Sequence, residues 1–302
     1  MEIVVFGAGS LGSLIGAKLA TVHDVTLVGR DPHMATVQAD GLRVTGLDAF
    51  LVHPTATTEG TDLNADLAIV TVKAFDTEAA ARTLASGSFD AVLSLQNGMG
   101  NEAILSDRLD CPVLAGTTTY GAVLQDPGVV EWTGRGDIIV GAWTEEAAEQ
   151  ADRVVDAFEQ ATLETSADDD MATRLWEKLA VNAAINPTTA LARVENGALA
   201  EPTLESIAHT AARETARTAR AEGADLADDR AIERTDSVIA ATASNRSSML
   251  QDVSAGRRTE IDAITGYLVD RATDHGIDAP TNRVLLALVR GWERGHGLRG
   301  DD

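Results

Sequence analysis

The sequence predicts a two-domain α/β protein, in which a mostly parallel sheet covered by helices is followed by a domain of helices alone. The first half alternates short apolar runs with helical patterns, which is typical of βαβ units. Beyond the acidic run 168–170 the sequence is alanine-rich and carries helical patterns without a convincing strand. We therefore expect domains at residues 1–167 and 168–302, each long enough to bury its own core.

The same patterns predict the individual elements. Strands of the parallel sheet are expected at five apolar runs: 3–6, 25–28, 67–72, 92–95 and 113–115. Helices are expected at 11–20 and 77–85, and again at 145–160. Apolar runs at 129–133 and 137–141, flanked by glycine turns, predict an antiparallel extension of the sheet. Four positions in the second half are expected to interrupt helices: Pro187, Pro202, Gly256 and Pro280.

Charge is the most unusual bulk property of the chain. Its 302 residues carry a formal net charge of −23. Such a field repels nucleic-acid phosphates and anionic membrane surfaces, so neither is an expected partner. The acid is spread along the chain, which indicates a solvated surface adapted to high salt, where the screening length is about 3 Å at 1 M. The alternative is an acidic protein that works at ordinary salt.

Compartment and metal content are also constrained. No apolar run approaches the roughly 20 residues of a membrane span. Met1 leads directly into a strand-like run, so no signal peptide is expected. The single cysteine, Cys111, excludes an internal disulfide framework and fits a reducing cytoplasm. The six histidines show no ligand spacing, so no metal is expected. These observations predict a soluble cytoplasmic protein.

Lysine is almost absent. Of the 24 lysines and arginines only Lys18, Lys73 and Lys178 are lysine. A lysine ammonium can give up its proton, whereas a guanidinium does not. Lys73 and Lys178 are therefore candidates for chemistry, while Lys18, in the first expected helix, is expected at the surface.

A glycine motif follows the first expected strand. The run Gly7-Ala8-Gly9-Ser10-Leu11-Gly12 has the form G-x-G-x-x-G and leads into a helix. Its glycines allow a tight turn, close approach to a pyrophosphate, and tight packing of helix on strand, while the helix N-terminus offers free N–H groups. Strand, motif, helix and second strand together predict a Rossmann dinucleotide-binding domain with Gly7, Gly9, Ser10, Leu11 and Gly12 at the cofactor. The alternative is a merely structural glycine turn.

The end of the second strand bears on which dinucleotide binds. Arg30 stands there and suits the 2′-phosphate of NADP(H), whereas an acid at this point serves the ribose of NAD(H). Asp31 offers such an acid, and Asp76 would repel a phosphate. NADP(H) is favoured and NAD(H) stays possible. The alternative for Arg30 is an ordinary surface arginine.

Two segments of the second half carry polar residues in a pattern that suggests chemistry. Lys178, Asn182 and Asn186 are spaced by four within apolar sequence, so a helix would align them in one stripe. Such a stripe either faces a wet cleft or forms a buried hydrogen-bond network without a catalytic role. Ser248 and Asp252 share a helix face in the second segment, and Gly256 is placed to break that helix before Glu260.

Together these stretches resemble the ketopantoate reductase (2-dehydropantoate 2-reductase) family over essentially the whole chain. The resemblance rests on the order and spacing of five of them: the glycine motif, 72–74, 96–100, 178–187 and 247–262. It implies a Rossmann domain, a helical domain like the C-terminal domain of 6-phosphogluconate dehydrogenase, and an active site in the cleft between them. The implied reaction is NADPH-dependent reduction of 2-dehydropantoate to (R)-pantoate, for pantothenate and coenzyme A synthesis.

The resemblance also implies residue roles. Lys178 corresponds to the general acid and Glu260 to a carboxylate near the reacting oxygen and the cofactor. Residues that correspond to the substrate-binding set are Asn97, Asn182, Asn186 and Ser248. Lys73 and Asn97 correspond to the nicotinamide side, and Arg30 to the arginine of the 2′-phosphate. This chain departs from the family by carrying Asp76 where NADPH-using members carry a glutamine, which weakens the NADP(H) assignment.

Two alternative functions stay open. A reductase of the same fold would act on another branched 2-oxo acid, because small changes in an apolar lining discriminate by only about 1–3 kcal/mol. From another class, the chain would be a non-catalytic NADP-binding redox sensor, although a sensor needs only the glycine-motif end. We expect a small-molecule 2-oxo acid as the partner and a monomer or homodimer as the assembly.

Overall fold

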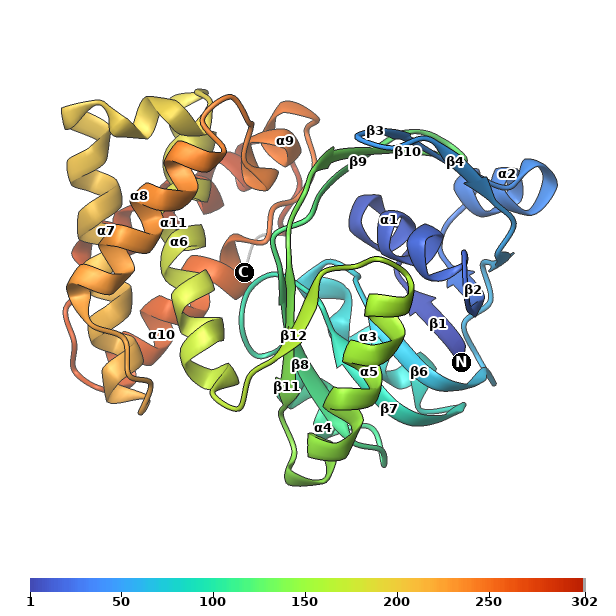
Figure 1. Ribbon diagram of the computed structural model, residues 1–302. Coiled ribbons are helices and arrows are strands. Elements are labelled where there is room, and N and C mark those ends of the chain that lie inside the picture. The colour runs from blue at the N-terminus through green and yellow to red at the C-terminus, as the bar shows by residue number, and fades with distance from the viewer. Residues whose placement is uncertain (301–302) are drawn as a thin grey trace. The chain divides into compact units, whose positions relative to one another are not determined.

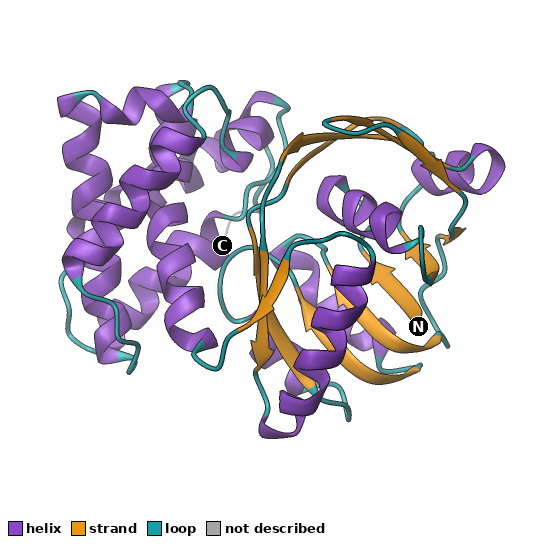
Figure 2. Ribbon diagram, viewed as in Figure 1, coloured by secondary structure: helices purple, strands orange, loops and turns teal. Residues whose placement is uncertain are grey.

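The computed structural model describes residues 1–300, which divide into two compact units, one of sheet and helices and one of helices (Figures 1 and 2). Unit 1 comprises Met1–Gln96 and Gly100–Met171. Unit 2 comprises Asn97–Met99 and the chain from Ala172 onward. The sequence suggested a single boundary after residue 167. In the structure a short loop from the middle of the first half also groups with the C-terminal helices.

Unit 1 is built on an eight-stranded sheet with the order β12-β11-β8-β7-β6-β1-β2-β5. Its strands are β1 (Glu2–Phe6), β2 (Asp24–Val28), β5 (Thr55–Thr57), β6 (Asn64–Val70), β7 (Ser88–Ser94), β8 (Val113–Thr118), β11 (Ile138–Ala142) and β12 (Thr165–Ala167). Neighbours from β5 to β8 pair in parallel, and β11 pairs antiparallel with β8. The order β5-β2-β1-β6-β7-β8 is the 3-2-1-4-5-6 order of the dinucleotide-binding fold. The predicted Rossmann class is confirmed.

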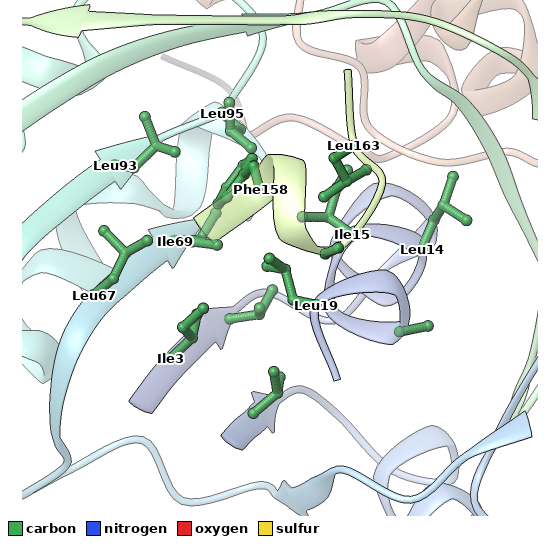
Figure 3. Close-up of a cluster of buried hydrophobic side chains, with 14 of the residues drawn as sticks. Ile3, Leu14, Ile15, Leu19, Leu67, Ile69, Leu93, Leu95, Phe158 and Leu163 are labelled. Atoms are coloured by element: carbon green, nitrogen blue, oxygen red, sulfur yellow. The ribbon is translucent and has the colours of Figure 1, made fainter. Parts of the chain in front are cut away.

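Helices cover both faces of this sheet. They are α1 (Ser10–Leu19), α2 (His33–Asp40), α3 (Thr77–Leu84), α4 (Asn101–Ser106) and α5 (Ala148–Gln160). Because successive strand residues point to opposite faces, Ile3 lies in one core cluster with residues of α1, such as Ile15 and Leu19, and with Phe158 of α5 (Figure 3). Val4 instead packs with Leu84 of α3 on the other face. A parallel sheet buried on both sides reads as continuous apolar runs, which is why these strands were visible in the sequence.

One strand prediction is wrong in its partner. The run 129–133 forms β10 (Val129–Gly134), which does not extend the main sheet but belongs to a second sheet with the order β4-β3-β10-β9. The other strands are β3 (Leu42–Gly46), β4 (Phe50–Val52) and β9 (Gly121–Asp126). A turn at Gly128, with φ +76°, folds β10 back on β9, and β10 then pairs in parallel with β3. In Figure 1 this sheet arches over α1. The run 137–141 does form the expected antiparallel strand β11.

Unit 2 consists of helices, and within residues 172–300 the structure has no strand. They are α6 (Met171–Ala192), α7 (Pro202–Ala221), α8 (Asp228–Ala241), α9 (Ser248–Ser254), the π-helix η4 (Asp262–Gly266), α10 (Tyr267–Asp274) and α11 (Pro280–Gly295). Pro202 and Pro280 occupy first helical positions, where a missing N–H costs nothing. Gly256, with φ +63°, follows the end of α9 as expected. Among the described residues no helix is long and apolar enough for a membrane span.

Pro187 does not interrupt its helix, contrary to the prediction. It lies inside α6, which continues to Ala192. A proline removes one helical hydrogen bond, but tertiary packing can hold the remaining turns together. Here Val181 and Ile185 of α6 pack with Leu199 and Ile239 from other parts of unit 2. The whole polar stripe therefore lies on one continuous helix.

Candidate active site

The glycine motif forms a turn in which each of the three glycines is required, or leaves space, for a different structural reason. Gly7 has φ +112°, and a Cβ there would lie 2.6 Å from the Val72 nitrogen. At Gly12 a Cβ would lie 2.5 Å from the Gly7 oxygen and 2.5 Å from Thr71 Oγ1, so only glycine lets α1 approach the strand ends. At Gly9 the nearest atom would be 3.9 Å away, which leaves room beside the backbone. The loop thus fits a pyrophosphate at its middle glycine.

The start of α1 presents backbone groups to the same place. Gly9 is the N-cap, and within the described residues no side chain caps this helix end. Ser10 and Leu11 are the first helical residues, so their N–H groups belong to the orphan donors of the N-terminus. The Ser10 hydroxyl accepts from the Leu124 N–H at 3.0 Å, which ties the motif to β9. The backbone N–H groups, rather than the Ser10 side chain, are therefore the groups available to an anion at this helix end.

Arg30 follows β2 and is highly exposed, with 88% of its side chain accessible. Its Nη2 lies 3.0 Å from Asp76 Oδ2. Asp76, which was expected to repel a phosphate at this position, therefore forms a direct ion pair with Arg30. A phosphate at Arg30 would have to compete with this carboxylate.

Lys73 lies where β6 leads into the loop before α3. It is half-buried and precedes the short 3₁₀ turn Ala74–Asp76. Gln96, 4% exposed, fixes this loop because its Nε2 donates to the Val72 carbonyl at 3.0 Å and to Thr77 Oγ1 at 2.7 Å. The sequence pattern gives Gln96 no role beyond its place in the stretch 96–100. Its buried amide is the group that shapes the Lys73 loop.

The polar stripe on α6 exists as predicted. Lys178 and Asn182 are half-buried and Asn186 is 5% exposed. The Lys178 Nζ is itself buried rather than directed into bulk solvent. The preceding turn of α6 is fixed, because Trp176 packs on Tyr267 with ring centroids 6.0 Å apart. The stripe therefore offers one ammonium and two amides from a rigid helix.

Two hydroxyls join α6 to α9. Thr189 Oγ1 contacts the Asn186 carbonyl at 3.2 Å and Ser247 Oγ at 2.7 Å. Ser247 caps α9 by accepting from the Leu250 N–H at 3.1 Å. Ser248 is exposed at the first position of α9, one residue after this cap. The Thr189–Ser247 contact was missed from the sequence, although a serine before an apolar helix is a capping signal.

Glu260 and Asn97 are brought to the same short segment of unit 2. Glu260 is 6% exposed and precedes η4. The Asn97 loop is seated on η4, because the Met99 N–H donates to the Ala263 carbonyl at 2.9 Å. These two residues are 163 positions apart in the printed sequence, and no local pattern linked them.

The predicted site residues thus fall into two sets. Unit 1 holds the cofactor set Gly7, Gly9, Ser10, Leu11, Gly12, Arg30 and Lys73. Unit 2 holds Asn97, Lys178, Asn182, Asn186, Ser248 and Glu260. Within residues 1–300 no group of three or more His, Cys, Asp or Glu is placed to hold a metal ion.

Lys18 was expected at the surface, and this is wrong. It is 5% exposed, and its Nζ lies 4.3 Å from the centroid of the Trp132 ring. Burial lowers the pKa of Lys18. The reason is the second sheet, which was not predicted over α1 and whose β10 supplies Trp132.

Comparisons with known proteins agree with this architecture. The family model "Ketopantoate reductase PanE/ApbA" matches residues 3–145, and "Ketopantoate reductase PanE/ApbA C terminal" matches residues 170–293. A 2-dehydropantoate 2-reductase from Halobacterium salinarum is 42% identical over 298 residues, covering 96% of this chain and 98% of that protein. One from Archaeoglobus fulgidus is 41% identical over 296 residues, covering 97% and 98%.

Solved structures give the same result. A PanE/ApbA family ketopantoate reductase from Ralstonia eutropha has a TM-score of 0.90 at 31% identity, covering 98% of this chain and 100% of that one. A D-mandelate dehydrogenase with NADH and anilino(oxo)acetate has a TM-score of 0.92 at 25% identity, covering 99% and 100%. Since both family models match and the relatives align along nearly their full length, this chain belongs to the ketopantoate reductase family.

Proposed function

We propose that this chain reduces 2-dehydropantoate to (R)-pantoate with NADPH, as an enzyme of pantothenate and coenzyme A synthesis. The observation that carries the proposal is the stripe of Lys178, Asn182 and Asn186 on one helix, in the same unit as the buried Glu260. This set supplies one proton donor, two amides and one carboxylate, which suits a small, polar 2-oxo acid. The relatives named 2-dehydropantoate 2-reductase support the same substrate.

A dinucleotide fits the first end of the site. The backbone at Gly9 is open where a pyrophosphate would lie, and the N–H groups of Ser10 and Leu11 face it. Lys73 and Asn97 would hold the nicotinamide side. When bound, the nicotinamide supplies the hydride that reduces the ketone.

Lys178 is the proposed general acid. As the ketone becomes an alkoxide, its ammonium donates a proton to the forming oxyanion, a contribution of typically about 10²–10⁴ in rate. Its cationic charge also attracts an anionic substrate within a protein of net charge −23. Asn182 and Asn186 would orient the substrate by hydrogen bonds, with Ser248 at the carboxylate and Glu260 near the reacting oxygen. A rigid helix supports this role because it holds donors at fixed spacing.

NADPH is proposed over NADH on the strength of Arg30. A guanidinium at the end of the second strand suits a 2′-phosphate through bidentate bonds. The 3.0 Å ion pair with Asp76 opposes that choice. The competition predicts a modest preference for NADPH, with NADH as a working second cofactor.

The main alternative is another 2-oxo acid. It is favoured by one observation, the likeness at a TM-score of 0.92 to a D-mandelate dehydrogenase. The deciding experiment is an assay that follows nicotinamide absorbance with 2-dehydropantoate and a panel of other 2-oxo acids, ranked by kcat/KM. The proposal requires 2-dehydropantoate to rank first. Tight NADPH binding without turnover of any 2-oxo acid would identify a redox sensor instead.

We also propose a cytoplasmic monomer or homodimer adapted to high salt. A single, half-buried cysteine, Cys111, and the net charge of −23 support this. Light scattering on the purified protein measures the assembly, and activity that rises with salt would support the salt adaptation.

A further inference from the structure

The residues on either side of Glu260 are anchored to one buried carboxylate. The Thr259 backbone N–H donates to Glu293 Oε1 at 2.8 Å, and the Thr259 hydroxyl donates to the same oxygen at 2.7 Å. The Ile261 N–H in turn donates to that hydroxyl at 3.3 Å. Glu293 belongs to α11 and is 0% exposed. The position of Glu260 is therefore set by a residue 33 positions later in the printed sequence.

Arg299 joins Glu293 to the start of η4. Its Nε and Nη2 donate to Glu293 Oε2 at 3.0 and 2.9 Å, and Nη2 also donates to Asp262. Burial alone would lower the pKa of Arg299, but hydrogen bonds to the two carboxylates outweigh it and raise that pKa. This guanidinium stays charged, and one side chain bridges both acids.

Asp262 is the first residue of η4 and is surrounded by arginines. Arg290 donates to Asp262 Oδ1 through Nε at 2.8 Å, and Arg258 Nη2 lies 3.6 Å from Oδ2. Burial would raise the pKa of Asp262, but hydrogen bonds from Arg299 and Arg290 outweigh it and lower that pKa. A partly buried carboxylate is well placed only when it is fully paired, and this one is. These contacts with three arginines hold the first residue of η4 in place.

The π-helical turn η4 connects this ion-pair network to the Asn97 loop through backbone hydrogen bonds. The Tyr267 N–H bonds to the Asp262 carbonyl, five residues back, whereas an α-helix would use the Ala263 carbonyl. The Ala263 carbonyl instead accepts from the Met99 N–H. Gly98, with φ +83°, fits against Ala263 because a Cβ would lie 2.7 Å from that carbonyl oxygen.

We infer that Glu293 and Arg299 are positioning residues that act on catalysis through Glu260. The same network seats the loop of Asn97 by way of η4. The inference rests on the proposed function, because it needs the role assigned there to Glu260. All of these contacts lie within unit 2.

The test is a double-variant cycle on the full chain. Arg299→Met should lower kcat/KM for 2-dehydropantoate on the order of tenfold or more, since small displacements of reacting groups are costly. The control is Arg271→Met, which breaks an exposed ion pair with Asp274 and should leave kcat/KM unchanged. In a Glu260→Gln background the Arg299→Met loss should be at least about fivefold smaller, because residues that act through one another are not additive.

Equal losses in the two backgrounds, or no loss from Arg299→Met, overturn the inference. If Arg299→Met does not fold, as judged by thermal unfolding, Glu293→Gln replaces it. That variant keeps an oxygen for Thr259 and removes only the charge, and the same non-additivity is required of it. An unchanged kcat/KM in Glu260→Gln alone overturns both this inference and the proposed site. A severe Glu260→Gln loss with additive Arg299 effects overturns the inference alone.

Discussion

The proposed cofactor residues of unit 1 and the proposed substrate residues of unit 2 differ in what they are made of. The proposed cofactor set of unit 1 is mostly backbone: Gly7, Gly9 and Gly12 make the space, and the start of α1 supplies N–H groups. The proposed substrate set of unit 2 consists of side chains, and charged contacts hold the Glu260 segment in place. A backbone site depends on what is absent, namely Cβ atoms. A side-chain site depends on the residues that hold each functional group, so a substitution outside the site can also disturb it.

The largest expected effect is at Lys178, where one substitution should change catalysis but not cofactor binding. Lys178→Arg keeps the charge but removes a proton that can be donated, so kcat should fall about 10²–10⁴-fold. NADPH affinity, which the proposal assigns mainly to the glycine motif and Arg30 rather than to Lys178, should stay within about twofold. Single-turnover kinetics and fluorescence titration measure the two quantities. Near-normal turnover would remove the general acid from the mechanism.

Two glycine variants distinguish a glycine that leaves room for a ligand from a glycine that the fold itself requires. Gly9→Ala should leave the unfolding midpoint unchanged, because its Cβ meets nothing closer than 3.9 Å. It should raise the Kd for NADPH about tenfold, or roughly 1.4 kcal/mol. Gly12→Ala should lower the unfolding midpoint as well, because its Cβ would lie 2.5 Å from Gly7 and Thr71 atoms.

The matched control for these variants is Gly291→Ala on α11, where a Cβ meets nothing within 4 Å. Alanine there should stabilise the helix by roughly 0.5–1 kcal/mol. If Gly9→Ala binds NADPH normally, the open space at the motif does not hold the pyrophosphate.

A smaller effect is expected at the Arg30–Asp76 pair. Asp76→Asn frees the guanidinium from a competing carboxylate, so the NADPH to NADH ratio of kcat/KM should rise. Exposed ion pairs are worth about 1 kcal/mol or less, which corresponds to a factor of about five. The control is Asp40→Asn, an exposed acid on α2. A preference that does not move would show that Arg30 does not read the 2′-phosphate.

The smallest effect concerns stability in acid. His33 is 5% exposed; its Nδ1 accepts from the Gly128 N–H, and its Nε2 contacts Ser13 Oγ, each at 2.9 Å. Burial lowers the pKa of His33, so the native state keeps it neutral while the unfolded chain takes up a proton below about pH 6.5. The stability it contributes is present above that pH and is lost as pH falls.

One such group changes the free energy of unfolding by at most about 1.4 kcal/mol per pH unit. His33→Gln should therefore flatten the stability curve between about pH 6.5 and 5, as measured by denaturant unfolding. His53→Gln, which removes an exposed imidazole, is the control. Parallel curves for His33→Gln and the parent would contradict the assignment.

The same contrast explains what the sequence predicted. The glycine motif and the α6 stripe are contiguous signals, so a local pattern was enough to find them. The second sheet was not found, because β3 and β4 are short and partly exposed, and because β3 pairs with β10 from far along the chain. Lys18 was misplaced for the same reason.

The contacts that hold the proposed substrate residues were missed for a related reason. Nothing in the sequence pairs Thr259 with Glu293, or Met99 with Ala263, because these contacts join separate elements. The resemblance supplied the candidate functional residues, whose roles stay a prediction. The structure shows which contacts hold the segments that carry them.

The scarcity of lysine has a practical consequence for amine chemistry. Lys18 is 5% exposed, and Lys73 and Lys178 are half-buried, so the folded surface offers acylating reagents few side-chain targets. Reaction at these amines would instead track the opening of the fold around each one. Mass spectrometry after brief acylation would then report, lysine by lysine, which part of the molecule loosens first when salt is withdrawn.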